Sequence, residues 1–238
     1  MRFIRDLMAL GLWITLSGGQ AFASDRPLVV VELFTSQGCS SCPPADALLT
    51  RLSRRDDVLA LSLHVDYWDY IGWPDTFARP EHTARQKAYA HAAGMRSIYT
   101  PQMIIAGKDH VIGSKPMDVI EYIDMAREMP ARLQMHAQLS DGLLRFEAKA
   151  MGQEGLPEVL QIILVTFLDS RSVVIKRGEN AGKTVEYTNI VTSMSRLGIW
   201  EGSGALLLEV PVEVQAGSMA VFLQEPGPGE ILGAVRVR

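Results

Sequence analysis

The chain's two cysteines, Cys39 and Cys42, are separated by two serines and come immediately before a segment with helical periodicity. A thiol just before a helix lies near unpaired backbone N–H groups and the positive end of the helix dipole, which stabilise its thiolate. The pattern therefore predicts a lowered pKa and an exposed sulfur for Cys39. Cys42, one turn further along, is expected to be shielded and to attack a mixed disulfide formed on Cys39.

Such a pair is compatible with a structural staple, a metal site or a redox centre. A disulfide that closes so short a loop removes little entropy from the unfolded chain, which argues against a staple. Structural zinc requires four ligands, and the sequence has no second cysteine pair and no His-x3–5-His cluster. Two thiolates can hold Cu(I), so copper binding stays open as an alternative. The position of the pair favours redox chemistry.

The apolar pattern up to residue 129 indicates the elements that position the pair. The run "LVVVELF" over 28–34 is typical of a strand buried on both faces. A helix over 44–55 and a second buried strand over 58–65 complete a β-α-β unit with parallel strands. There follow an aromatic loop, a helix over 81–93, two short strands around a turn at 107–109, and a helix over 115–129. The predicted order is β-α-β-α-β-β-α.

The sequence changes character near Met129 and Pro130. Beyond this point, alternating strand-like segments separated by Gly, Asp, Asn and Pro turns replace the helical pattern. Such a region of about 100 residues is typical of an antiparallel β-sandwich. We therefore expect a redox domain over 25–130 and a β-sandwich-like domain over 131–238.

Residues 1–23 have the pattern of a signal peptide, with an Arg-containing start, an apolar run and the small-residue site Ala21-Phe22-Ala23. The apolar run is shorter than the ~20 residues needed to cross a bilayer, so no stable membrane insertion is expected after cleavage. Export to the periplasm or beyond the cell would allow a disulfide to persist. The formal net charge is −4 and no basic stripe is present, which argues against nucleic-acid binding.

These motifs carry a resemblance to known proteins. The predicted element order, with the cysteines at the head of the first helix and Pro101 directly before the third strand, resembles the thioredoxin fold. Four stretches in order resemble a family of secreted bacterial proteins of unknown function with a thioredoxin-like domain: "ELFTSQGCSSCPPAD", "HVDYWDYIGW", "YTPQMIIAG" and "RGENAGKTVEYTNIV". We therefore expect an α/β fold class, with a thioredoxin-like domain followed by an antiparallel β-sandwich-like domain.

The thioredoxin resemblance implies a role for each matching position. Cys39 would be the nucleophile and Cys42 the resolving thiol. Pro101 would be a cis-proline facing the pair, and Thr100 before it would offer backbone groups to an incoming peptide. From the residues alone, Pro101 could also begin a strand through a trans bond. The chain departs from thioredoxin in its Ser-Ser dipeptide and in Gly38, which stands where an aromatic residue is usual, so the direction of the redox reaction stays open.

Two further groups are candidates for the site. Glu32 lies in the first apolar strand, where it either relays a proton to Cys42 or is a structural, hydrogen-bonded carboxylate. Tyr67 and Trp68 belong to the aromatic loop over 66–77 and are predicted to bind substrate, since aromatic residues with polar groups favour recognition surfaces. Ordinary packing of a long loop is the alternative for both aromatic residues.

The sequence as a whole predicts an exported thiol–disulfide oxidoreductase that acts through Cys39 and Cys42 on protein or small-molecule thiols, together with a redox partner. No cofactor and no metal site are assigned, and the oligomeric state is left open. The alternatives are a periplasmic Cu(I)-binding or delivery protein that uses the same pair, and a non-catalytic binding module. The polar segment "RGENAGK" over 177–183 is predicted to be a solvated loop tip.

Overall fold

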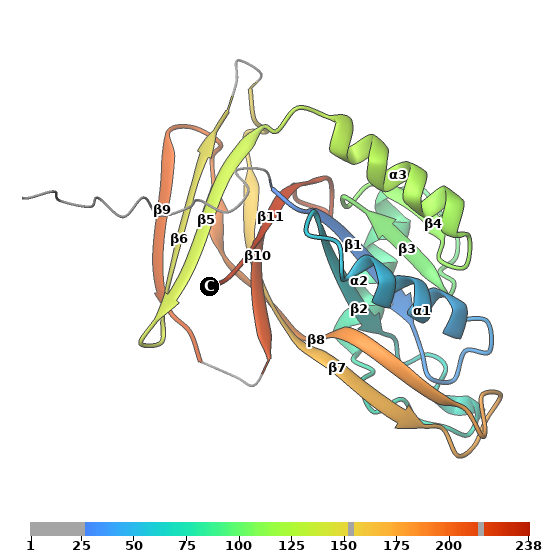
Figure 1. Ribbon diagram of the computed structural model, residues 1–238. Coiled ribbons are helices and arrows are strands. Elements are labelled where there is room, and N and C mark those ends of the chain that lie inside the picture. Colours follow the sequence, from blue (N-terminus) through green and yellow to red (C-terminus); the bar gives the residue numbers. More distant parts are fainter. Residues whose placement is uncertain (1–26, 152–154, 214–216) are drawn as a thin grey trace, which may run out of the picture.

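The computed structural model describes residues 27–151, 155–213 and 217–238 (Figure 1). Within these ranges, strands account for 44% of the residues and helices for 19%. The predicted signal peptide over 1–23 lies outside the described residues. Among the helices that are described, none combines the length and apolar character needed to span a membrane.

The first part of the chain contains the predicted order of elements. β1 (Val29–Thr35) and β2 (Val58–His64) are parallel strands connected by α1 (Pro43–Leu52). Their burial is nearly continuous, as their unbroken apolar runs predict. After them come η1 (Asp69–Ile71), α2 (Pro80–Ala92), β3 (Gln102–Ile105), β4 (Asp109–Ile112) and α3 (Pro116–Glu128). β3 pairs antiparallel with both β1 and β4.

The rest of the described chain is built from strands. They are β5 (Leu133–Ser140), β6 (Leu143–Ala150), β7 (Leu160–Val174), β8 (Thr184–Trp200), β9 (Ala205–Pro211), β10 (Ser218–Gln224) and β11 (Ile231–Arg236). β5, β6 and β9 form a three-stranded antiparallel sheet. β7 and β8 form a long hairpin whose far end extends past α1 (Figure 1), where Thr188 of β8 hydrogen-bonds Thr50 of α1.

The predicted fold class was wrong. We expected a thioredoxin-like α/β domain followed by an antiparallel β-sandwich-like domain, whereas one eight-stranded mixed sheet, β11-β10-β7-β8-β2-β1-β3-β4, contains strands from both sides of residue 130. The two parts join where β2 pairs with β8, in register at Ser62 and Ile190. Apolar alternation indicates which faces of a strand are buried but not which strand lies beside it, so this pairing left no signal in the sequence.

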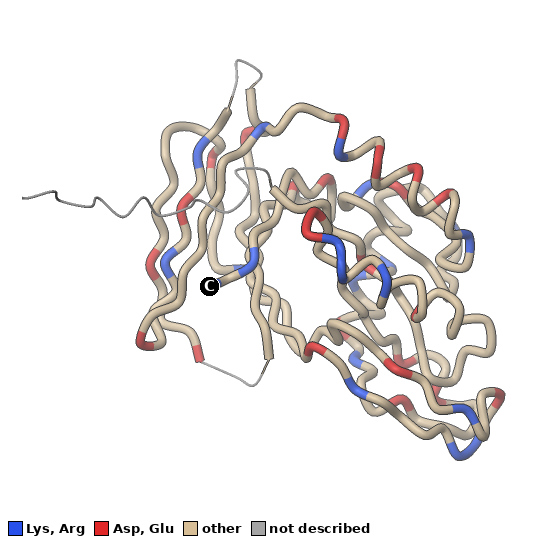
Figure 2. Tube along the Cα trace, in the orientation of Figure 1, with Lys and Arg blue, Asp and Glu red and all other residues tan. Residues whose placement is uncertain are grey.

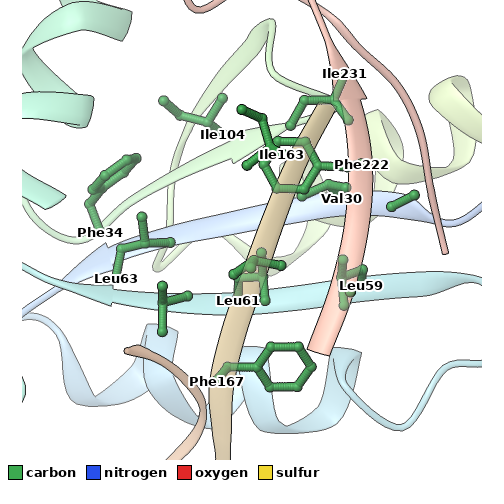
Figure 3. Packing of buried hydrophobic residues seen from close by; sticks show 14 of the residues in the cluster. Val30, Phe34, Leu59, Leu61, Leu63, Ile104, Ile163, Phe167, Phe222 and Ile231 are labelled. Carbon is green, nitrogen blue, oxygen red and sulfur yellow. The ribbon is translucent and has the colours of Figure 1, made fainter. Parts of the chain in front are cut away.

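The core lies where the large sheet curves over itself. β7 and β10 cross above β1 and β2, and Phe167 and Phe222 share a buried cluster with the leucines of β2 (Figure 3). On the other side of β1, Val31 and Leu33 pack with α1 and α3. Because side chains alternate along a strand, odd-numbered residues of β1 face α1, whereas even-numbered ones face α2 and the crossing strands. This alternation decides which side chains of β1 can reach the head of α1.

Charged residues of both signs are interspersed along the described chain (Figure 2). Some ion pairs connect segments that are distant in the sequence. One example is the pair between Lys108, after β3, and Glu230, before β11, in which Nζ and Oε1 are 2.9 Å apart. Partly exposed pairs of this kind contribute about 0.2–1 kcal/mol each, so apolar packing holds these segments together.

Candidate functional site

Cys39 and Cys42 form a disulfide at the head of α1. Cys42 is the N-cap residue, and Pro43 and Pro44 take the first helical positions, where a missing N–H costs little. Cys39 lies in the preceding turn, and its carbonyl oxygen accepts a hydrogen bond from the N–H of Cys42 at 3.2 Å. The pair therefore lies where the sequence predicted, between a buried strand and the start of a helix.

The disulfide is almost enclosed. Cys39 is 2% exposed and Cys42 is 0% exposed, so the predicted shielding of Cys42 is confirmed and the predicted exposure of Cys39 was wrong. The aromatic loop packs against the same turn: a Cβ added at Gly38, next to Cys39, would lie 3.3 Å from Cβ of Trp68 and 3.2 Å from Cδ1 of Ile71. Cys39 is still the more exposed residue of the pair, and the two serines that follow it are exposed.

A buried carboxyl group lies behind the disulfide. Asp46 of α1 is 3% exposed, and its N–H donates to the carbonyl oxygen of Cys42 at 3.1 Å. Its Oδ1 accepts a hydrogen bond from the Thr35 hydroxyl at 2.8 Å, whereas Oδ2 has no hydrogen-bond partner among the described residues. Burial raises the pKa of Asp46 to about 7, although nearby His64 and the Thr35 hydroxyl act in the opposite direction. Asp46 can therefore carry a proton near neutral pH.

His64 and Asp75 form a second buried polar pair. His64 Nδ1 lies 2.7 Å from Asp75 Oδ2, and neither side chain is exposed. The same oxygen accepts a hydrogen bond from the N–H of Gln37 at 2.7 Å, which connects the pair to the turn before Cys39. The rings of Phe77 and Tyr187 pack against His64. A buried histidine–carboxylate pair in apolar surroundings therefore supports the turn that precedes Cys39.

Glu32 lies on the opposite face of β1 from α1. Arg85 of α2 donates to both of its oxygens, from Nε to Oε1 at 2.6 Å and from Nη2 to Oε2 at 2.9 Å. The Tyr89 hydroxyl also donates to Oε2. With both oxygens occupied and the residue 0% exposed, these contacts correspond to the structural alternative stated for Glu32.

The Thr100–Pro101 peptide bond is cis, as the resemblance implied. A Cβ added at Gly113 would lie 3.2 Å from the Cβ atoms of both Pro101 and Ala45. Because Ala45 is in the first turn of α1, Pro101 lies beside the helix start that carries the disulfide.

Trp68 and Tyr67 point to different parts of the molecule. Trp68 Nε1 donates to the Thr100 hydroxyl at 2.7 Å, and its ring stacks with exposed Tyr70 at a centroid distance of 6.4 Å. The Tyr67 hydroxyl donates to Gln86 Oε1 of α2 at 3.1 Å, and burial raises the pKa of Tyr67 to about 12. The structure brings Trp68 and Thr100 to the disulfide's turn and directs Tyr67 toward α2; their binding of substrate stays a prediction.

The tip of the β7–β8 hairpin also reaches the disulfide's turn. Asn180 is 1% exposed, although the residues on either side of it are exposed. Its Nδ2 donates to the carbonyl oxygen of Gln37 at 2.9 Å and to that of Cys39 at 2.8 Å. The segment over 177–183 is a loop tip, as predicted, but its asparagine is buried against the site rather than solvated.

Three residues of the site, Asp46, Asp75 and Asn180, were not predicted from the sequence. Asp46 could have been found from the alternation along β1. This alternation places Thr35, and not Glu32, on the face toward α1, where Thr35 contacts Asp46. Asp75 and Asn180 belong to loops without periodicity, and no sequence pattern reports which distant backbone a loop side chain contacts. The described residues contain no group of three or more His, Cys, Asp or Glu that could hold a metal ion.

Comparisons with known proteins give a family without an assigned activity. A family model described as "Protein of unknown function (DUF1223)" matches residues 30–224. A crystal structure of a protein from Agrobacterium tumefaciens is similar over 90% of this chain and 95% of that chain, with 32% sequence identity and a TM-score of 0.78. HBP35 of Porphyromonas gingivalis shares the fold at 16% identity and a TM-score of 0.61, over 90% of this chain and 75% of that chain. No curated protein matches the chain.

Proposed function

Since the chain belongs to this family of proteins of unknown function, we propose from its site that it is a thiol–disulfide oxidoreductase acting through Cys39 and Cys42. The observation that carries the proposal is the disulfide at the head of α1, with the buried carboxyl group of Asp46 in the first turn of that helix. So short a disulfide loop adds little stability, which leaves its chemistry as the reason for the pair.

The first step is attack by a substrate thiolate. Because Cys42 is 0% exposed, the incoming sulfur reaches Sγ of Cys39. A new S–S bond forms between the substrate and Cys39, the bond between the two cysteines breaks, and its electron pair leaves on Cys42. The carboxylic acid of Asp46 then gives its proton to the Cys42 thiolate.

A second substrate thiolate completes the reaction. It attacks the substrate sulfur of the mixed disulfide and releases Cys39 as a thiolate, so that two electrons have moved from the substrate's thiols to the cysteine pair. The start of α1 stabilises this thiolate, and the Ser41 hydroxyl, 3.5 Å from Sγ of Cys39, can donate a hydrogen bond to it. The reverse sequence of steps reduces a substrate disulfide.

We assign the proton to Asp46 rather than to Glu32. Asp46 lies on the helix that Cys42 caps and has an oxygen without a hydrogen-bond partner among the described residues, and its burial raises its pKa to about 7. Glu32 is bound by Arg85 on the other face of the sheet.

The proposal includes location and partners. The signal-peptide pattern over 1–23 and the stability of disulfides in oxidising compartments support a periplasmic or secreted protein. The substrates are protein thiols or small thiols, and a separate redox partner is needed to return the pair to its starting state after each turnover.

The test uses the chain without residues 1–23 in two assays, reduction of insulin disulfides and oxidative refolding of a reduced protein. We expect activity in at least one assay and only background activity for Cys39→Ser, which lacks the accessible sulfur. Cys42→Ser should accumulate a mixed disulfide with substrate, visible by mass spectrometry, because the resolving thiol is missing. Inactivity of the wild-type protein in both assays, with both thiols titratable after reduction, would exclude the proposed function.

A further inference from the structure

The hairpin tip is anchored beside the disulfide by apolar packing. Between the end of β7 and the start of β8, the buried residues are Ile175 and Asn180. Ile175 packs in a cluster with side chains of β8 and with Trp73 and Phe77 from the loop after β2. Trp73 in turn donates from Nε1 to Oε1 of Gln37 at 2.8 Å. The tip therefore rests on the same loop that supports the turn before Cys39.

The hydrogen bonds of Asn180 fix the orientation of its amide. Both Nδ2 hydrogens are used, one for the carbonyl oxygen of Gln37 and one for that of Cys39. Its Oδ1 accepts a hydrogen bond from Nζ of Lys183 at 2.8 Å. A flipped amide would place an oxygen against two carbonyl oxygens and an NH2 group against an ammonium, so only one orientation satisfies every partner.

The two cysteines are held by different parts of the fold. Cys42 is the N-cap of α1, where its carbonyl accepts hydrogen bonds from the first turn of the helix. Cys39 is outside the helix, in a turn whose backbone bonds to Ser36 and Cys42 are both 3.2 Å long. Asn180 adds shorter bonds to this turn from a segment 141 residues away in the sequence. The turn is thus fixed by the hairpin as well as by its own local contacts.

We propose that Asn180 is a positioning residue for Cys39, which fixes the turn over residues 37–39 so that the two sulfur atoms stay close and the disulfide closes readily. The inference rests on the proposed function, for which closure and opening of this disulfide is the reaction. A group held in the geometry of reaction has a higher effective concentration toward its partner, because less freedom is lost when the bond forms. Removing Asn180 releases the turn and lowers this effective concentration.

The test is the equilibrium of the cysteine pair with glutathione. In this exchange, the Cys39 and Cys42 thiols are oxidised to the disulfide while oxidised glutathione is reduced to two thiols, so no further reactant is needed. Asn180→Ala should shift the equilibrium toward the dithiol by about fivefold, the range expected for loss of positioning hydrogen bonds. The oxidised and reduced fractions are measured by alkylation and mass spectrometry at fixed pH.

Asn189 offers a matched control on the same hairpin. Its Nδ2 donates to the carbonyl oxygen of Ala60 at 2.8 Å, away from the disulfide's turn. Asn189→Ala should lower the thermal stability while leaving the glutathione equilibrium at its wild-type value. An unchanged equilibrium in Asn180→Ala, or an equal shift in both variants, would overturn the inference.

A milder variant covers the case in which Asn180→Ala does not fold. Lys183 is exposed, so Lys183→Met keeps the buried amide and removes only the partner of its oxygen. We expect a shift of about twofold in the same direction, because the amide is then less firmly oriented; no shift would count against the inference. The insulin-reduction and oxidative-refolding assays of the wild-type protein test the proposed function separately. A positioning effect without any turnover of protein substrates would therefore reject only the function.

Discussion

Replacing Arg85 by methionine is expected to destabilise the fold by about 3–5 kcal/mol, the usual cost of leaving one partner of a buried ion pair without its counter-ion. The variant keeps much of the apolar stem of the arginine but removes both hydrogen bonds to Glu32, which is 0% exposed. It also removes the donor to Gln224 Oε1 of β10, so the loss extends to the strands that cross β1. Urea unfolding followed by circular dichroism measures the change in the free energy of unfolding.

The double variant Glu32→Gln/Arg85→Met is the control. It removes both charges, so most of the lost stability should return even though the double variant contains no ion pair. Because Glu32 and Arg85 lie on the face of the sheet away from α1, this variant should also keep the proposed redox activity. A double variant as unstable as Arg85→Met would contradict the electrostatic account, and a loss of activity in a stable double variant would restore Glu32 as a proton relay.

Replacing Asp46 by asparagine should make the protein more stable at alkaline pH. The folded-state pKa of about 7 lies above the ordinary value of 3.8, so between these values the folded protein keeps a proton that the unfolded chain has lost. The free energy of unfolding therefore falls as the pH rises through this window, by up to about 4 kcal/mol. The asparagine side chain has no charge at any pH, so the variant should match the wild-type protein near pH 3.8 and exceed its stability at pH 8. Urea unfolding at a series of pH values measures the difference between the two proteins.

The same substitution should slow the proposed redox reaction. An amide cannot give a proton to the Cys42 thiolate, and loss of a general acid costs about 10²-fold or more in rate. Thr35→Val is the matched variant, because it removes the hydrogen bond that lowers the pKa of Asp46 but leaves the carboxyl group in place. It should remain active. Its free energy of unfolding should continue to fall with rising pH to a higher pH than that of the wild-type protein, because the pKa of Asp46 is then raised further. If the free energy of unfolding of Asp46→Asn varied with pH as that of the wild-type protein does, the pKa of Asp46 would not be raised in the folded protein.

The local structure of the site was predictable, since it depends on short-range patterns. The buried strand, the prolines of the first helical turn and the position of the cysteine pair follow from periodicity and from the conformational preferences of proline. The shared sheet was not predictable, because β2 and β8 are joined by backbone pairing at Ser62 and Ile190, to which no side-chain pattern corresponds. For this reason, the predicted fold class placed the two parts of the chain in separate sheets.

The assignment of a proton donor in the proposed reaction depends on a different kind of information. Glu32 attracted attention because a carboxylate is unusual in an apolar strand, but its position on the strand was the decisive information. Counting along β1 places Thr35 on the face toward α1 with Val31 and Leu33, and Thr35 is the residue that contacts Asp46. The turn before Cys39 packs against Trp68 and Ile71 at Gly38, and no propensity describes the conformation of their loop.

The contact between Asn180 and the carbonyl oxygens of Gln37 and Cys39 has a consequence for how this protein can vary during evolution or be recombined in the laboratory. The part of the chain beyond residue 130 contains no cysteine, yet it supplies a buried group to the disulfide's turn. A chimera that took residues 131–238 from a relative would place that relative's hairpin tip against the carbonyl oxygens of Gln37 and Cys39. Substitutions at the hairpin tip and in the "SQGCSSC" turn are therefore expected to be correlated among relatives, although the two segments lie in different parts of the chain.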